Sequence, residues 1–245
     1  REIILTGVNI GTFGLNNNES FFGLLKVIDN QCSDVRIRLG STEPELMSNE
    51  IIDLDTQSDV IMPHFHLPLQ SGCDDTLKRM HRRYDTSLFR DRAKTIKKQI
   101  PHACIAADVI TGFPGESDEE FTQTFNFIKS LPISYLHVFP YSDRPLAKAS
   151  KYPDHINSNT IRQRVTQLIE LGHEKQQVFY RENLESIRPM LAEGTRKDGL
   201  RFGFTDNYIK CAIPENIISE NEISLVKLTH IAPTGEFVFG DTLTI

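Results

Sequence analysis

Strand-like and helix-like segments alternate along the first 183 residues, and this alternation constrains the fold more than any other feature. Each strand-like run is rich in apolar and β-branched residues, and apolar residues at helical spacing follow it. Strands that alternate with helices of this length form parallel sheets with right-handed crossovers. We therefore predict an α/β fold in which five βα units form a partial, TIM-like (βα) barrel. The predicted strands lie within residues 2–7, 35–44, 61–72, 103–113 and 134–142, and the helices within 20–30, 45–55, 74–80, 87–100, 117–131 and 158–183.

Residues 184–245 have a different pattern, in which short alternating runs are separated by the turn sequences KDG, TDN and PTG. Runs of this kind are typical of short β-strands joined by tight turns. We therefore predict two domains, the partial (βα) barrel over residues 1–183 and a small all-β barrel over residues 184–245.

Charge and cysteine content narrow the class of protein. The net charge of −6 argues against a surface coated for polyanions, although residues 78–98 carry a strong local excess of Lys and Arg. No run of about 18 apolar residues occurs, so we expect no membrane span. The cysteines are far apart in the sequence, which fits reduced thiols in a cytoplasmic protein better than a disulfide framework. They are Cys32, Cys73, Cys104 and Cys211.

The stretch GFPGES, residues 112–117, joins a strand-like run to an acidic helix. Ser117 and Glu120 have the spacing of a capping box, so the helix is expected to begin at this corner. Gly112 and Gly115 would let backbone N–H groups approach a ligand, and a helix N-terminus favours an anion. A tight βα turn without any ligand explains the same residues equally well.

Each of the five predicted strands ends in a polar or glycine-bearing segment: TGVNIG, GSTEP, PLQSG, TGFPGE and PYSDRP. The carboxyl ends of parallel barrel strands gather at one mouth, where ligands bind. None of the segments has the spacing of a P-loop or of a dinucleotide fingerprint. We therefore predict a ring of ligand contacts at this mouth that belongs to neither of those nucleotide-binding classes.

His64 and His66 alternate along one predicted strand and so face the same side. Two histidines without a third ligand favour packing or substrate contact over metal binding. We assign no metal ligand in this chain.

Five segments, in this order and spacing, resemble the radical S-adenosylmethionine (SAM) methylthiotransferases, the MiaB-like tRNA-modifying enzymes. They are LTGVNIGTFG, RIRLGSTEP, HFHLPLQSGCDDTLKRMHRRY, DVITGFPGES and YLHVFPYSDRP. The form GVNIG most resembles the branch that methylthiolates N6-threonylcarbamoyladenosine next to the anticodon. The resemblance covers about residues 1–180, and the β-rich tail is similar to the TRAM domain that ends these enzymes.

The resemblance implies SAM as cofactor and a 4Fe-4S cluster that an electron donor reduces. In these enzymes a C-x-x-x-C-x-x-C loop after the first barrel strand holds that cluster, and an N-terminal domain holds a second one. This chain shows neither, so we expect the cluster ligands to lie outside it and this chain alone to be inactive. The expected partner is the anticodon arm of a tRNA, and we expect a monomer without a membrane partner.

The resemblance also implies positions for the cofactor. Gly7 and Asn9 would meet the methionine amino group, Gln70 and Ser71 would lie near the ribose, and Asp108 would lie along the cofactor with residues 112–116. The family commonly has a threonine where this chain has Ala147 in PYSDRPLAKA. The full implied cofactor set is Gly7, Asn9, Glu43, Gln70, Ser71, Asp108, Gly112, Gly115, Glu116 and Tyr141.

Two regions are predicted to contact RNA. The basic run would bind phosphates, although a solvated helix face explains it as well. In the tail, two alternating phenylalanines beside a tyrosine and a lysine suit base stacking, but such residues also fill small barrels, and the tail is acidic overall. The predicted contacts are Arg79, Arg82, Arg83, Phe202, Phe204, Tyr208 and Lys210.

The sequence leaves other functions open. A methylthiotransferase acting on N6-isopentenyladenosine or on a ribosomal protein would share these motifs. A phosphate-binding aldolase or isomerase barrel would need a Lys or Glu pair as base, and no predicted strand end offers a lysine. A pure RNA-binding protein would not need a ring of polar strand ends.

Overall fold

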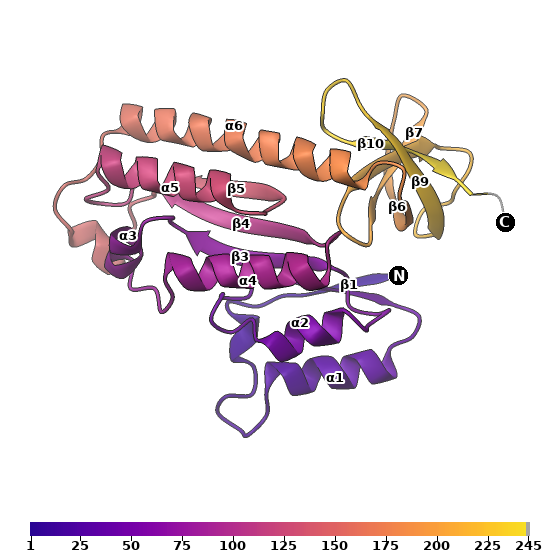
Figure 1. Cartoon of the computed structure of the whole chain (residues 1–245), viewed down its shortest axis with the longest axis horizontal. Coiled ribbons are helices and arrows are strands. Elements are labelled where there is room, and N and C mark those ends of the chain that lie inside the picture. The colour runs from indigo at the N-terminus through magenta and orange to yellow at the C-terminus, as the bar shows by residue number, and fades with distance from the viewer. Residues whose placement is uncertain (244–245) are drawn as a thin grey trace.

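Five βα units follow one another in the computed structural model, which describes residues 1–243 (Figure 1). This confirms the predicted order of strands and helices. The elements are β1 (Glu2–Leu5), α1 (Phe21–Gln31), β2 (Arg36–Leu39), α2 (Asn49–Asp55), β3 (His64–Gln70), α3 (Asp74–Arg79), α4 (Thr86–Gln99), β4 (Cys104–Thr111), α5 (Asp118–Ser130), β5 (Tyr135–Pro140) and α6 (Ser158–Asn183). Short 3-10 helices lie at Ile10–Thr12 and Lys148–Lys151.

The parallel strands form two sheets, β1-β2 and β3-β4-β5, and an isolated bridge between Ile37 and Ile61 joins β2 to the segment before β3. Helices cover one face of these sheets. On β3, Phe65 and Leu67 are buried in one apolar cluster with Phe89 of α4. The alternate residues of β3 face the opposite, concave side, which we call the lumen.

One predicted helix begins later than expected. Residues 45–55 were expected to be helical, but α2 begins at Asn49. The backbone N–H groups of Leu46 and Met47 both donate to the carbonyl of Glu43, which closes a turn before the helix. Met47 is buried in the core from this turn, so packing replaces the first helical turn.

The C-terminal strands close into a small barrel in the order β10-β8-β7-β6-β9. They are β6 (Ile187–Lys197), β7 (Leu200–Thr205), β8 (Lys210–Pro214), β9 (Ile223–Ile231) and β10 (Val238–Thr242). Met190, Val226 and Leu228 lie in its core. The all-β prediction is confirmed for the described strands, whereas its last two residues, 244–245, lie outside the described part.

The small barrel contacts the amino-terminal ends of β2 and β4. Arg36 donates to the carbonyl of Thr205 (2.9 Å), and Arg38 donates to that of Asp206 (3.0 Å). Asn207 donates to the carbonyl of His102 (2.8 Å), just before β4. No helix in residues 1–243 is long and apolar enough to cross a membrane.

Candidate active site at the strand ends and in the lumen

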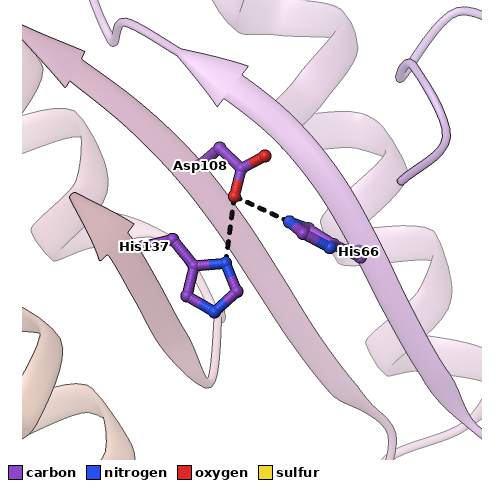
Figure 2. A group of neighbouring side chains, drawn as sticks. All are labelled: His66, Asp108 and His137. Atoms are coloured by element: carbon purple, nitrogen blue, oxygen red, sulfur yellow. Dashed lines mark hydrogen bonds and ion pairs between the residues drawn. The ribbon is translucent and has the colours of Figure 1, made fainter. Parts of the chain in front are cut away.

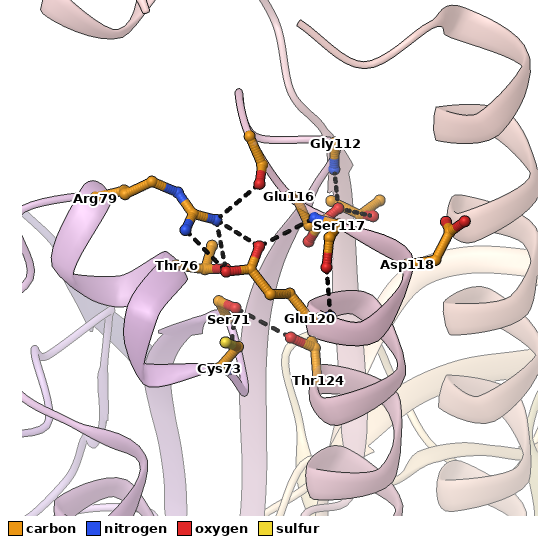
Figure 3. Close-up of polar contacts among 12 residues, drawn as sticks. Ser71, Cys73, Thr76, Arg79, Gly112, Glu116, Ser117, Asp118, Glu120 and Thr124 are labelled. Carbon is orange, nitrogen blue, oxygen red and sulfur yellow. Dashed lines mark hydrogen bonds and ion pairs between the residues drawn. The ribbon is translucent and has the colours of Figure 1, made fainter. Parts of the chain in front are cut away.

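The GFPGES corner begins α5 as the capping box predicted (Figure 3). The Glu120 N–H donates to Ser117 Oγ (3.2 Å), and the Ser117 N–H donates to Glu120 Oε2 (3.0 Å). Glu120 is also paired with Arg79 (2.6 Å). The helix start is therefore fixed from both sides of the corner.

Glu116 ties this corner to α6 from a buried position. Its Oε2 accepts hydrogen bonds from the Gly112 N–H (2.7 Å), the Thr111 hydroxyl (3.2 Å) and Arg164 Nη1 (2.7 Å). Burial raises the pKa of Glu116, and the backbone of Gly112 and the charge of Arg164 oppose that rise. One carboxylate oxygen is thus used inside the protein, while the buried Oε1 has no partner among the described residues. Glu116 therefore links the corner to α6. Its predicted role as a cofactor contact did not include this link.

The two glycines of the corner have different surroundings. Both have positive φ, +81° at Gly112 and +78° at Gly115. A Cβ at Gly112 would lie 2.4 Å from Ile161 of α6, whereas at Gly115 the nearest heavy atom would be Arg79 Nε at 3.6 Å. Gly112 is therefore required for packing, and only Gly115 leaves room beside the backbone.

The end of β3 combines strain with burial. Gln70 has φ of +64°, which non-glycine residues rarely adopt and which tends to occur at functional sites. Ser71 is buried, and its hydroxyl lies 3.0 Å from that of Thr124 and accepts from the Cys73 N–H (3.2 Å). Gln70 thus stays a candidate ligand contact, while the Ser71 hydroxyl is used in holding α5.

Gly7 and Asn9 line a cavity of about 320 Å³ after β1, together with Phe13 and Phe21. The side-chain oxygen of Asn9 is buried there and has no hydrogen-bond partner among the described residues. A buried acceptor without a partner is unfavourable unless a ligand or water supplies a donor. Its position therefore fits the amino group that the resemblance places beside it.

Tyr141 follows β5 and packs edge-to-face on Phe113, with ring centroids 5.4 Å apart. Its hydroxyl is buried and makes no well-aligned hydrogen bond in residues 1–243, although the carboxylate of Asp143 is close enough to help raise its pKa. Burial raises the pKa of this hydroxyl, so it stays a hydrogen-bond donor. Asn9 thus offers an unpaired acceptor after β1, and Tyr141 offers a hydroxyl donor after β5.

Two of the three predicted phosphate-binding arginines are engaged inside the protein. Arg79 pairs with Glu120, and Arg82 pairs with Glu43 (2.8 Å). Burial raises the pKa of Glu43, and Arg82 opposes that rise. Arg83 is exposed, and no hydrogen bond or ion pair of the described residues involves it. Arg79 and Arg82 are thus already paired with carboxylates, and their contact with tRNA phosphates stays a prediction.

Three polar side chains from adjacent strands meet in the lumen (Figure 2). Asp108 Oδ1 accepts from His66 Nε2 (2.7 Å) and from His137 Nδ1 (3.1 Å). Burial raises the pKa of Asp108, but the hydrogen bonds of His137 and His66 outweigh it and lower the pKa to about 2. Asp108 is therefore an ionised acceptor, and both imidazoles present a proton to it.

His137 was not among the predicted site residues. It lies opposite Asp108 in the parallel register of β4 and β5. Its place in the alternating run YLHVFP, two residues after Tyr135, was the only available sequence indication of a lumen position.

The aromatic residues of the tail lie at the junction with the larger barrel. Tyr208 stacks on Phe204 (4.6 Å between centroids) and lies 4.3 Å from the His64 ring. Phe202 is only 7% exposed, and Lys210 Nζ lies 5.3 Å from the centre of its ring. Packing thus holds the rings of Phe202 and Tyr208 inside the junction, and base stacking on them stays a prediction that this packing does not favour. Contacts of Phe204 and Lys210 with RNA stay a prediction.

The part of the chain that contains these strand ends resembles a known protein family. The model of the radical SAM superfamily matches residues 2–128. This chain belongs to the radical SAM superfamily. The superfamily implies SAM and a 4Fe-4S cluster, and the unpaired side-chain oxygen of Asn9 in its cavity fits a polar cofactor. Within residues 1–243 the four cysteines are free and form no ligand group with one another.

Curated relatives of this radical SAM chain are tRNA-modifying enzymes by name. A threonylcarbamoyladenosine tRNA methylthiotransferase of Bacillus subtilis is 37% identical, over 97% of this chain and 55% of the relative. A tRNA-2-methylthio-N(6)-dimethylallyladenosine synthase of Pelotomaculum thermopropionicum is 31% identical, over 96% of this chain and 52% of the relative. The chain thus spans about half the length of these relatives.

A solved structure shows the fold of this radical SAM chain independently of close sequence likeness. Coproporphyrinogen III oxidase of Escherichia coli, a radical SAM enzyme, superposes with a TM-score of 0.52 at 13% identity. The match covers 90% of this chain and 55% of the oxidase. At this identity the likeness concerns the fold alone.

Proposed function

We propose that this chain is part of a tRNA methylthiotransferase that adds a methylthio group to N6-threonylcarbamoyladenosine next to the anticodon. The observation that carries the proposal is the 37% identity to a relative named for that substrate. The identity is 31% to a relative named for N6-dimethylallyladenosine, which is the same nucleoside as N6-isopentenyladenosine. The polar lumen of His66, Asp108 and His137 supports it, because a threonylcarbamoyl group is polar and a dimethylallyl group is a hydrocarbon.

The cofactor chemistry would be shared between this chain and ligands outside it. When bound, a reduced 4Fe-4S cluster supplies the electron that cleaves SAM to methionine and a carbon radical. In this chain, Asn9 and Tyr141 would bind the cofactor, and Gln70 and Gly115 would border it. We propose that the cluster cysteines, those of a second cluster included, lie in the longer protein, and that this chain alone is inactive.

The intact protein, with reconstituted clusters and a reductant, should add a methylthio mass to tRNA that carries N6-threonylcarbamoyladenosine. Mass spectrometry of the digested tRNA measures the product. A matched tRNA that carries N6-isopentenyladenosine is the control, and a ribosomal protein fraction is a second one. Modification of the isopentenyl substrate alone would assign the chain to the sister activity.

Of the three arginines predicted to bind phosphate, we propose Arg83 as the contact, because it is exposed. Replacing Arg83 by alanine in the intact protein should weaken tRNA binding and reduce the slope of log affinity against log salt by about 1, because one fewer counterion is released. Lys98, exposed at the far end of the same basic run, is the control. Equal slopes for Arg83→Ala and Lys98→Ala would show that the run acts only through its overall charge.

A further inference from the structure

The lumen group of His66, Asp108 and His137 is built like a set of metal ligands. One donor atom of each residue lies within 4.8 Å of the other two. The residues come from β3, β4 and β5, so three hydrogen-bonded strands hold the donors and no loop is involved. We propose that these three side chains bind a divalent transition-metal ion, with the remaining coordination position facing the lumen.

The donor set selects the class of ion. Two imidazoles and one carboxylate suit Zn²⁺, Fe²⁺ or Co²⁺ rather than Mg²⁺ or Ca²⁺, which prefer oxygen ligands. Tetrahedral bonds of about 2.0–2.2 Å place neighbouring donors about 3.4 Å apart. The present separations from Asp108 Oδ1 are 2.7 and 3.1 Å, and the two imidazole nitrogens lie within 4.8 Å of each other, so binding requires the carboxylate oxygen to move slightly away from both rings.

The second ring nitrogen of His66 has a hydrogen-bond partner, as that of metal-bound histidines usually does. Its Nδ1 lies 3.2 Å from the hydroxyl of Ser41, which follows β2. When a metal occupies Nε2, the proton moves to Nδ1 and is donated to Ser41 Oγ, as partners of ligating histidines commonly accept it. The proton of His137 moves in the same way to Nε2, on the half-exposed side of the ring.

Charge indicates the fourth ligand. Neutral imidazoles and one carboxylate give the group a charge of −1, so a divalent ion leaves +1 facing the lumen. An anionic oxygen ligand would neutralise it. On the proposed function, which this step assumes, that ligand is the carboxylate of the threonylcarbamoyl group, and a dimethylallyl group offers none.

Cobalt titration of the chain tests the metal site. Wild type should bind one Co²⁺ with visible d–d bands of a four- or five-coordinate ion. Asp108→Asn should weaken the affinity by more than about 100-fold, and Ser41→Ala by about 10- to 100-fold. His173→Asn, an exposed histidine on α6, should leave it unchanged. Circular dichroism and melting of each variant confirm that it is folded.

The result that would overturn the metal site is an absence of stoichiometric binding, or equal affinity in wild type and Asp108→Asn when both are folded. Adding N-carbamoylthreonine to the cobalt form should shift the d–d bands, and carbamoylated threoninol, which lacks the carboxylate, should not. Binding of cobalt without such a shift would support the metal site and contradict the proposed fourth ligand. The titration requires no SAM, cluster or tRNA, so its outcome is independent of the methylthiotransferase assay.

Discussion

Replacing Arg164 by leucine should lower the free energy of unfolding by about 3–5 kcal/mol, because it leaves the buried carboxylate of Glu116 without its partner. The side chains of Arg164 and Glu116 are 5% and 0% exposed. Arg164 also donates to the carbonyl of Glu116 (3.1 Å) and pairs with Asp118 (2.7 Å), so one substitution removes three contacts. Urea unfolding monitored by circular dichroism measures the loss.

The loss at Arg164 should depend on pH. Without Arg164, the pKa of Glu116 rises further above its usual value of 4.5, so the folded state holds a proton that the unfolded state has released. The variant is therefore expected to lose stability as the pH rises above 4.5, and its unfolding is compared with that of wild type at pH 5 and at pH 8. Arg162→Ala, on the exposed side of α6, should change stability by less than about 0.5 kcal/mol. An equal loss for Arg164→Leu at both pH values would contradict a buried, unpaired charge.

Asn in place of Asp55 should stabilise the protein at pH 8 and have little effect near pH 4. Asp55 is 6% exposed, and neither carboxylate oxygen has a hydrogen-bond partner among the described residues. Burial raises the pKa of Asp55 from 3.8 to about 8. The unfolded chain thus ionises this group at a lower pH than the folded protein, so stability falls as the pH rises between those values. The upper limit of the gain for Asp55→Asn is about 5 kcal/mol.

Thermal and urea unfolding at several pH values measure this gain. Asp59→Asn is the matched control, because Asp59 borders the same cavity of about 280 Å³ and is exposed. It should shift stability by less than about 0.5 kcal/mol at every pH. A gain for Asp55→Asn that is the same at pH 4 and pH 8 would show that the carboxylate is not held in its protonated form.

The order of elements could be predicted because local patterns specify it. Apolar periodicity marks the strands and helices, and Ser117 with Glu120 marks the start of α5 within three residues of sequence. The capping box needs no distant partner. The small barrel was predictable for the same reason, since turn sequences separate its strands.

Contacts between distant residues were not predictable from these patterns. Glu116 lies 48 residues before Arg164, and nothing local indicates that the two are paired. The lumen group depends on the register between strands, which brings His137 opposite Asp108. Tyr208 looked available for stacking because its neighbour in space, His64, lies in the other barrel.

Helix α6 joins the GFPGES corner to the small barrel. It has 26 residues without a break, about 39 Å of rod. Near its start, Arg164 is paired with Glu116 of the GFPGES corner. At its end, Asn183 accepts a hydrogen bond from Asn207 of the small barrel (2.9 Å). A tilt of about 5° at the corner would displace the far end by about 3 Å. Helix α6 thus connects the strand ends to the small barrel, and we expect a tilt of the helix at the corner to shift that barrel.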